Sequence, residues 1–233
     1  MPSMSTILKS LALASILSLA TASPIAAPAR ASVDCKTAAA TPTGAAPTIP
    51  TSGNTPDLPS TTLSLVYVAV GRGTQNYTCL AAGANSTATG AIATLFDATS
   101  LAYANITAVH AIPPIAVNQA VPSGSLDSSS GPLSVLGNHF FDASGTPTFN
   151  LSAANKILFG AKTGDVKAPA TSSKGPAGTG AVDWLSLTAK PAPYVSDGVS
   201  LVYRVETAGG VAPACTAAGT MIVQYSAEYW FYV

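Results

Sequence analysis

Charge is scarce in this sequence. Only 9% of its 233 residues are Asp, Glu, Lys or Arg, and ten basic side chains balance ten acidic ones. A nucleic-acid-binding protein needs a basic stripe, and an electrostatic membrane binder needs a polybasic cluster. Neither pattern occurs, so we expect no nucleic acid among the partners. Solubility is left to hydroxyl side chains and to any attached glycans.

Long apolar runs are also missing. Residues 11–20 form an apolar segment that is shorter than the roughly 20 residues of a membrane helix, so we expect no membrane insertion. Lys9 precedes this segment and the small-x-small triplet at 20–22 follows it, as in a cleavable signal peptide. We therefore predict that residues 1–22 are a signal peptide and that the protein is secreted; a signal anchor is the alternative.

Cysteine is rare, with Cys35, Cys79 and Cys215 as the three examples. Export permits disulfides, and an odd count leaves one thiol over. A Cys79–Cys215 or a Cys35–Cys215 bridge would close a long loop, and either would stabilise by roughly 4–5 kcal/mol. The spacing leaves both pairings open. We expect no metal site, because no C-x-x-C occurs and His110 and His139 are far apart in sequence.

Four Asn-x-Ser/Thr sequons are present, none with Pro in the middle. They begin at Asn76, Asn85, Asn105 and Asn150. A glycan is bulky and hydrated, so each site in use must lie at the surface. Behind a signal peptide, the four sequons predict a secreted glycoprotein.

Composition divides the chain after the leader. Residues 23–60 are rich in Pro, Thr, Ala and Ser, which predicts a disordered, extended linker. The alternative is that part of this segment wraps the core as an irregular strand held by Cys35. Residues 61–233 are expected to form a single β domain.

Strand patterns dominate residues 61–233. Residues 63–70 form a β-prone run that we expect to end at the glycines of 71–73. Residues 97–104 suit a turn of helix at most, and 113–132 should be a long loop. These features predict an all-β fold, an antiparallel sandwich or barrel with long loops.

The segment 221–232 shows the clearest strand periodicity. Side chains alternate between the two faces of a strand, so one set builds a core face and the other a mixed face. The core set is Met221, Val223, Tyr225, Ala227, Tyr229 and Phe231; the mixed set is Ile222, Gln224, Ser226, Glu228, Trp230 and Tyr232.

Five ordered motifs lie along the domain: G-T-Q-N-Y-T-C at 73–79, G-N-H-F-F at 137–141, V-D-W-L at 182–185, V-Y-R-V-E-T-A-G-G-V-A-P at 202–213 and Y-S-A-E-Y-W-F-Y at 225–232. Together they resemble a family of secreted fungal and bacterial proteins that is grouped as a domain of unknown function. The resemblance implies a secreted, β-rich domain and brings no catalytic residues. Some members carry a malate dehydrogenase label; no G-x-G-x-x-G opens a helix here, so we expect no nicotinamide and no other cofactor.

Candidate catalytic residues are few. Glu206 and Glu228 both fall on mixed strand faces, and two carboxylates across a cleft would suit a glycosidase. The simpler alternative is an ion pair between a glutamate and Arg204. His139, beside two Phe, is either a general base or a hydrogen-bonded core residue. No G-x-S-x-G elbow supports an esterase.

Aromatic side chains offer a platform for sugar rings or, alternatively, a core. The candidates are Trp184, Trp230, Tyr229, Tyr232 and Tyr77. Trp230 shares its strand face with Gln224 and Tyr232, so we predict a binding site from these three with Arg204. The expected function is a secreted, non-catalytic glycoprotein that contacts cell-wall or host polysaccharide. The alternative is a polysaccharide hydrolase that uses Glu206 and Glu228.

Overall fold

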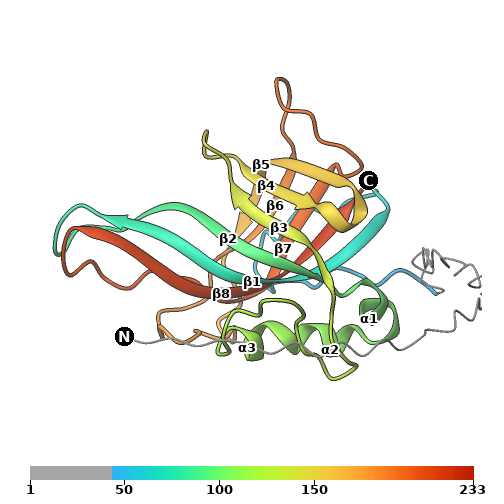
Figure 1. Cartoon of the computed structure of the whole chain (residues 1–233), viewed down its shortest axis with the longest axis horizontal. Coiled ribbons are helices and arrows are strands. Elements are labelled where there is room, and N and C mark those ends of the chain that lie inside the picture. Colours follow the sequence, from blue (N-terminus) through green and yellow to red (C-terminus); the bar gives the residue numbers. More distant parts are fainter. Residues whose placement is uncertain (1–43) are drawn as a thin grey trace, which may run out of the picture. The chain divides into compact units, whose positions relative to one another are not determined.

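Eight antiparallel strands close into a barrel in sequence order in the computed structural model, which describes residues 44–233 (Figure 1). The barrel closes because the last strand pairs with both the first and the seventh. This confirms the all-β antiparallel prediction as a barrel. The strands are β1 (Leu65–Cys79), β2 (Thr87–Asp97), β3 (Val135–Phe141), β4 (Pro147–Leu151), β5 (Lys156–Val166), β6 (Trp184–Ala189), β7 (Leu201–Gly209) and β8 (Gly219–Tyr232).

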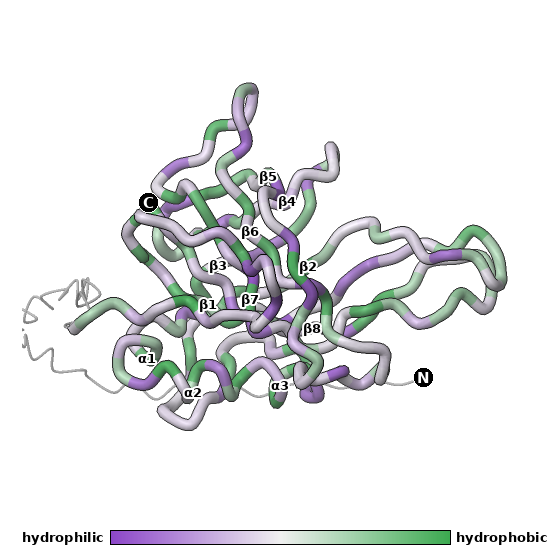
Figure 2. The backbone as a smooth tube through the Cα atoms, turned by 180° about the vertical axis from the view of Figure 1, so that it is seen from behind, coloured by the Kyte–Doolittle hydropathy of each residue, from purple (hydrophilic) through white to green (hydrophobic). Residues whose placement is uncertain are grey.

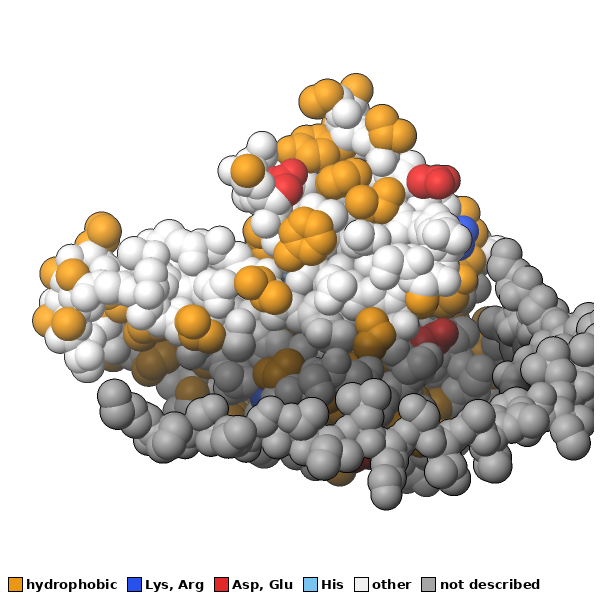
Figure 3. All heavy atoms as spheres, viewed as in Figure 1, with side chains coloured by type: hydrophobic (Ala, Val, Ile, Leu, Met, Phe, Trp, Pro, Cys, Tyr) orange, Lys and Arg blue, Asp and Glu red, His pale blue; other side chains and the backbone are white. Residues whose placement is uncertain are grey.

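Strands β1 and β8 pair along their whole length and extend beyond the barrel. Where β3 and β7 no longer pair with their neighbours, β2, β1 and β8 continue as a three-stranded arm (Figure 1). In the matching view of Figure 3, hydrophobic side chains gather at the end of this arm, and Leu80, Ile92 and Ile222 are exposed on it.

A disulfide joins Cys79, at the end of β1, to Cys215, just before β8. It is one of the two predicted pairings; Cys35 lies outside the described residues. The two cysteines are 136 positions apart, so the bridge contributes about 4–5 kcal/mol through the loss of unfolded-chain entropy.

The glycines at 71–73 do not end the first strand, which corrects the prediction. A Cβ on Gly71 would strike the ring of Tyr229 inside the barrel, and a Cβ on Gly73 would strike the backbone of Ile92 on β2. Glycine is needed here because neighbouring groups approach the backbone closely, not because the chain turns.

Three short helices lie in a row along one side of the barrel (Figures 1 and 2): α1 (Thr99–Ala104), α2 (Ile106–His110) and α3 (Ile112–Ala116). The predicted turn of helix within 97–104 corresponds to α1, and residues 117–132 contain no helix or strand, as the loop prediction requires; α2 and α3 are not predicted, so the loop prediction is wrong for 113–116. Each helix has only five or six residues, too few to show a 3.6-residue apolar pattern.

No helix within residues 44–233 is long and apolar enough to cross a membrane. A 3₁₀ turn, η1 (Ser152–Ala154), joins β4 to β5.

Alternation along the strands produces two cores. The inner core fills the barrel, and the outer core lies between the barrel wall and the helices. Strand β8 is therefore buried on both faces, with Tyr225, Tyr229 and Phe231 inside and Trp230 and Tyr232 outside.

Residues 44–60 contain no helix or strand but pack on the barrel. Ile49 and Leu58 contact the outer core, and the Tyr203 hydroxyl donates to the Pro59 carbonyl at 2.6 Å. This part of the predicted linker therefore contacts the barrel, as in the alternative of a wrapping segment; the Cys35 that would hold that segment lies outside the described residues. The predicted signal peptide and residues 23–43 lie outside the described residues.

Candidate functional site

The residues singled out from the sequence fall on opposite faces of the barrel wall. Glu228, Trp230 and Tyr232 belong to the outer face, whereas Arg204 and His139 line cavities on the inner side. The wall separates them, so the sequence candidates form two clusters.

Glu228 is the centre of the outer cluster and is fully buried. Its Oε1 lies 2.8 Å from Nδ1 of His110 on α2, and its Oε2 accepts a hydrogen bond from the Trp230 indole at 2.9 Å. The hydrogen bond to Glu228 raises the pKa of His110, against the opposing effect of burial. This ion pair fastens the helix layer to β8. Because the two residues are 118 positions apart, no sequence pattern predicts the contact.

Glu206 lies close to Glu228, as the sequence predicts for a carboxylate pair. It has a positive φ of 46° and sits at the irregularity in β7 between Val205 and Ala208. Burial, followed by the Glu228 charge, raises the pKa of Glu206. Glycosidase carboxylates flank an open cleft, but both Glu228 oxygens are already bound and shielded from solvent. The arrangement therefore suits a structural contact.

Four of the five aromatic candidates are buried, which agrees with the alternative that they form a core and contradicts the binding site predicted at Trp230 and Tyr232. Trp184, Trp230 and Tyr229 have no exposed surface, and Tyr232 is 6% exposed, so none can lie flat against a sugar. The mixed face of β8 is covered by helices that the sequence did not reveal. Tyr77 remains partly exposed.

Arg72 is a second buried charge beneath the helices and was not predicted. It is 1% exposed and donates to backbone carbonyls only, those of Gly73, Ala116, Val117, Gln119 and Tyr225. Burial lowers its pKa. Since its acceptors are main-chain atoms of β1, β8 and the end of α3, side-chain patterns give no signal of these contacts.

Arg204 does not pair with either glutamate, which corrects the predicted ion pair. Its side chain faces inward, whereas Val205 on the next position faces the outer core. Its Nε and Nη2 donate to the Asp183 carbonyl at 3.3 and 2.8 Å. The guanidinium therefore lies at the mouth of the barrel, away from Glu228.

Small-molecule sites are typically cavities of about 300–1,000 Å³, and the mouth of this barrel holds one of ≈ 380 Å³. We call it the mouth cavity. Its lining comes from β1, β2, β5, β6, β7 and the adjoining loops: Gln75, Tyr77, Ser86, Ala88, Lys162, Asp165, Lys167, Val182, Asp183, Leu185, Arg204, Val211 and Ala212. Within residues 44–233 no three His, Cys, Asp or Glu side chains gather as a metal-binding set.

Gln75 is the unusual member of the mouth cavity. It is 8% exposed, and its Nε2 has no hydrogen-bond partner in the described part of the chain. The neighbouring Tyr77 hydroxyl donates to the Gly210 carbonyl at 2.7 Å, which leaves its oxygen free to accept. The sequence offers no reason to select Gln75, although it is the glutamine of the G-T-Q-N-Y-T-C motif at 73–79.

Two other buried polar atoms have no partner among the described residues: Trp184 Nε1 and Gln224 Oε1. Trp184 is sealed in the outer core. Gln224 is half-buried and lines a different cavity, where its neighbours include Pro176, Met221 and Ile222 and none is charged. Gln75 alone of the three combines a lone donor with charged neighbours.

His139 lies beside a smaller cavity of ≈ 30 Å³ that Arg204 also lines. Its ring stacks on Phe149 at 4.2 Å, and its Nδ1 donates to the Thr148 carbonyl at 3.0 Å. Burial lowers the pKa of His139 to about 4, so the ring is neutral near pH 7. The core interpretation of His139 therefore fits better than a general base.

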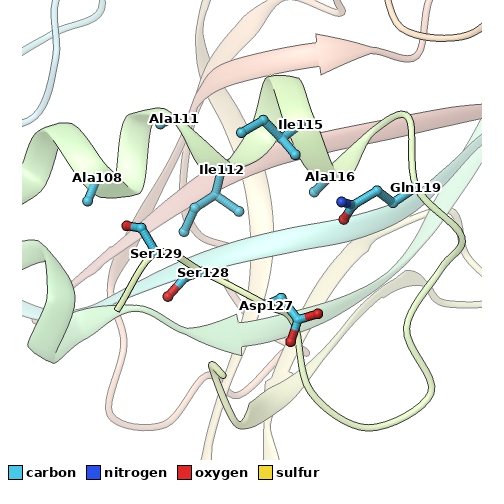
Figure 4. A pocket seen from close by; sticks show the side chains of 9 residues that line it. All are labelled: Ala108, Ala111, Ile112, Ile115, Ala116, Gln119, Asp127, Ser128 and Ser129. Atoms are coloured by element: carbon cyan, nitrogen blue, oxygen red, sulfur yellow. The ribbon is translucent and has the colours of Figure 1, made fainter. Parts of the chain in front are cut away.

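An apolar groove of ≈ 240 Å³ separates α3 from the facing loop (Figure 4). Ile112, Ile115 and Ala116 line its helical side, and Asp127 and Ser128 line the other. It contains no buried polar group without a partner, so the mouth cavity is the stronger candidate site.

The predicted glycosylation sites differ in exposure. Asn85, Asn105 and Asn150 are exposed, whereas Asn76 is half-buried on β1. Asn105 accepts the Ala108 N–H through Oδ1 as the cap of α2, and this contact does not use Nδ2, the atom that carries a glycan. Geometry is thus compatible with a glycan at three sites, and their use stays a prediction.

Comparison with known proteins gave one match. A family model described as "Protein of unknown function (DUF3455)" matches residues 59–233, the barrel with its helices. No curated protein and no solved structure matched the chain. Since the match covers most of the sequence and agrees with the motif resemblance, the chain belongs to the DUF3455 family.

Proposed function

We propose that this protein is an exported, non-catalytic barrel that binds a saccharide in its mouth cavity. The observation that carries the proposal is the Gln75 amide, a buried donor that has no partner within residues 44–233 and lies at the edge of the mouth cavity. Such a donor costs about 1–3 kcal/mol of stability, which a ligand oxygen would recover. A site with this cost is better explained by binding than by packing.

The chemistry of the mouth cavity suits a sugar. Gln75 and Arg204 supply donors, the Tyr77 oxygen supplies an acceptor, and Val182 and Leu185 supply apolar surface for ring C–H groups. The signal-peptide pattern, the sequons and the Cys79–Cys215 disulfide support export.

The hydrolase alternative has less support. Its nucleophile or acid would be Glu228, which has no exposed surface and no free oxygen. A glycosidase requires both carboxyl groups to reach the scissile bond.

The proposal is tested by Gln75→Leu, with Gln224→Leu as the matched control. We expect Gln75→Leu to lose saccharide binding about tenfold or more on a glycan array. Its urea midpoint should stay level or rise, because an unpaired buried amide is removed. Gln224→Leu should bind as the wild type does.

Wild-type binding by Gln75→Leu would reject the mouth cavity as the site. Release of reducing sugar by the wild-type protein, abolished in Glu228→Gln, would reject the non-catalytic function instead. The two outcomes are measured independently on the same preparations.

A further inference from the structure

The mouth cavity holds one positive charge that its own carboxylates do not pair. Lys162 Nζ lies 2.6 Å from Asp165, and Lys167 Nζ lies 2.9 Å from Asp183. Arg204 instead faces the Asp183 carbonyl and forms no ion pair within residues 44–233. The lining of the mouth cavity therefore has three positively charged side chains and two carboxylates, and one bound anionic group would neutralise the remaining positive charge.

The guanidinium of Arg204 is suited to a carboxylate. Nε and Nη2 contact the Asp183 carbonyl, and the cation also lies near the Tyr229 hydroxyl. The other N–H groups of the planar fork match the two oxygens of a carboxylate. A single unpaired cation balances a monoanion better than a phosphate, whose charge approaches about −2 at neutral pH.

Granted the mouth site proposed above, we infer that its ligand is an acidic saccharide. The uronate carboxylate binds Arg204, and a neighbouring ring hydroxyl accepts from the Gln75 amide and donates to the Tyr77 oxygen. A polysaccharide built of uronates offers this combination of one carboxylate and vicinal hydroxyls on every ring. Neutral glucans and chitin lack the carboxylate and leave Arg204 unpaired.

The test is calorimetric titration of the full secreted protein with a galacturonate trimer, its methyl ester and a neutral galactose trimer. We expect the acid to bind about tenfold or more tightly than its ester. Arg204→Gln should lose this preference, and Arg204→Lys should keep part of it. Lys174→Gln removes one positive charge from an exposed loop position outside the cavity and should bind as the wild type does.

Equal affinity for acid and ester, or wild-type affinity in Arg204→Gln, would overturn the acidic ligand while leaving the mouth site in place. Displacement of the trimer by inorganic phosphate at lower concentration than by galacturonate would overturn it too. If Arg204→Gln does not fold, the ratio of the affinities for the acid and for its ester, measured in the wild type and in Arg204→Lys, tests the inference instead. Failure of the mouth site itself appears separately, as wild-type binding in Gln75→Leu.

Discussion

The two histidines should give stability an opposite dependence on pH. His139 is buried, and its pKa is about 4 compared with an ordinary value of 6.5. As the pH falls below 6.5, the unfolded chain takes up a proton that the folded barrel excludes until about pH 4. The contribution of a neutral His139 is therefore present above pH 6.5 and lost on acidification. At about 1.4 kcal/mol for each pH unit, the loss reaches about 3 kcal/mol.

His110 acts in the reverse direction because the hydrogen bond to Glu228 raises its pKa above 6.5. The folded state then holds the proton more tightly than the unfolded chain. The contribution is fully present below pH 6.5 and is lost as the pH rises through the raised pKa. Together the two histidines predict maximal stability near pH 6.5, with a decline on either side.

Urea denaturation between pH 4.5 and 9 measures both limbs. His139→Gln keeps a donor for the Thr148 carbonyl but does not titrate, so the acid limb should flatten. His110→Gln should flatten the alkaline limb. Glu206 has a raised pKa and favours folding toward low pH, so the acid limb is best measured with Glu206→Gln as background. An acid limb of unchanged slope in His139→Gln would refute the reasoning.

Three further predictions concern stability and are read from urea midpoints. Glu228→Ala should cost about 3–5 kcal/mol, because it leaves the half-buried His110 and the buried Trp230 indole without their acceptor; a cost below about 1 kcal/mol would contradict the structural role of Glu228. Gly73→Ala should lower the free energy of unfolding by more than about 2 kcal/mol. The control Gly124→Ala, where a Cβ meets nothing, should change it by no more than about 0.5 kcal/mol. Similar losses in the two variants would contradict the close contact between Gly73 and β2. Cys79→Ser should lower stability by about 4–5 kcal/mol, and reduction of the wild type should reproduce the loss.

Strand periodicity predicts the all-β fold well, because one long strand carries a period of two, but it leaves the choice between sandwich and barrel open. The alternation at 221–232 identifies Tyr225, Tyr229 and Phe231 as core residues, and the barrel interior contains all three. Helices α2 and α3 are not predicted because each has too few residues to show a periodic pattern. Because the helix layer is not predicted, Trp230 is expected to be exposed, whereas the structure buries it.

Polarity on a strand face is a poor guide to function in this molecule, whereas an unsatisfied polar group is a better one. The outer face of β8 carries Ser226 and Glu228, of which the sequence offers Glu228 as a catalytic candidate. Both are satisfied internally: the Ser226 hydroxyl donates to the Gly71 carbonyl at 2.8 Å, and Glu228 accepts from two side chains. Gln75, on the inner face, is also polar, and its amide nitrogen has no partner in the described part of the chain. Because the described structure satisfies Glu228 and leaves the Gln75 amide nitrogen without a partner, Glu228 is accounted for by stability, whereas Gln75 is the residue on which the proposed ligand site depends.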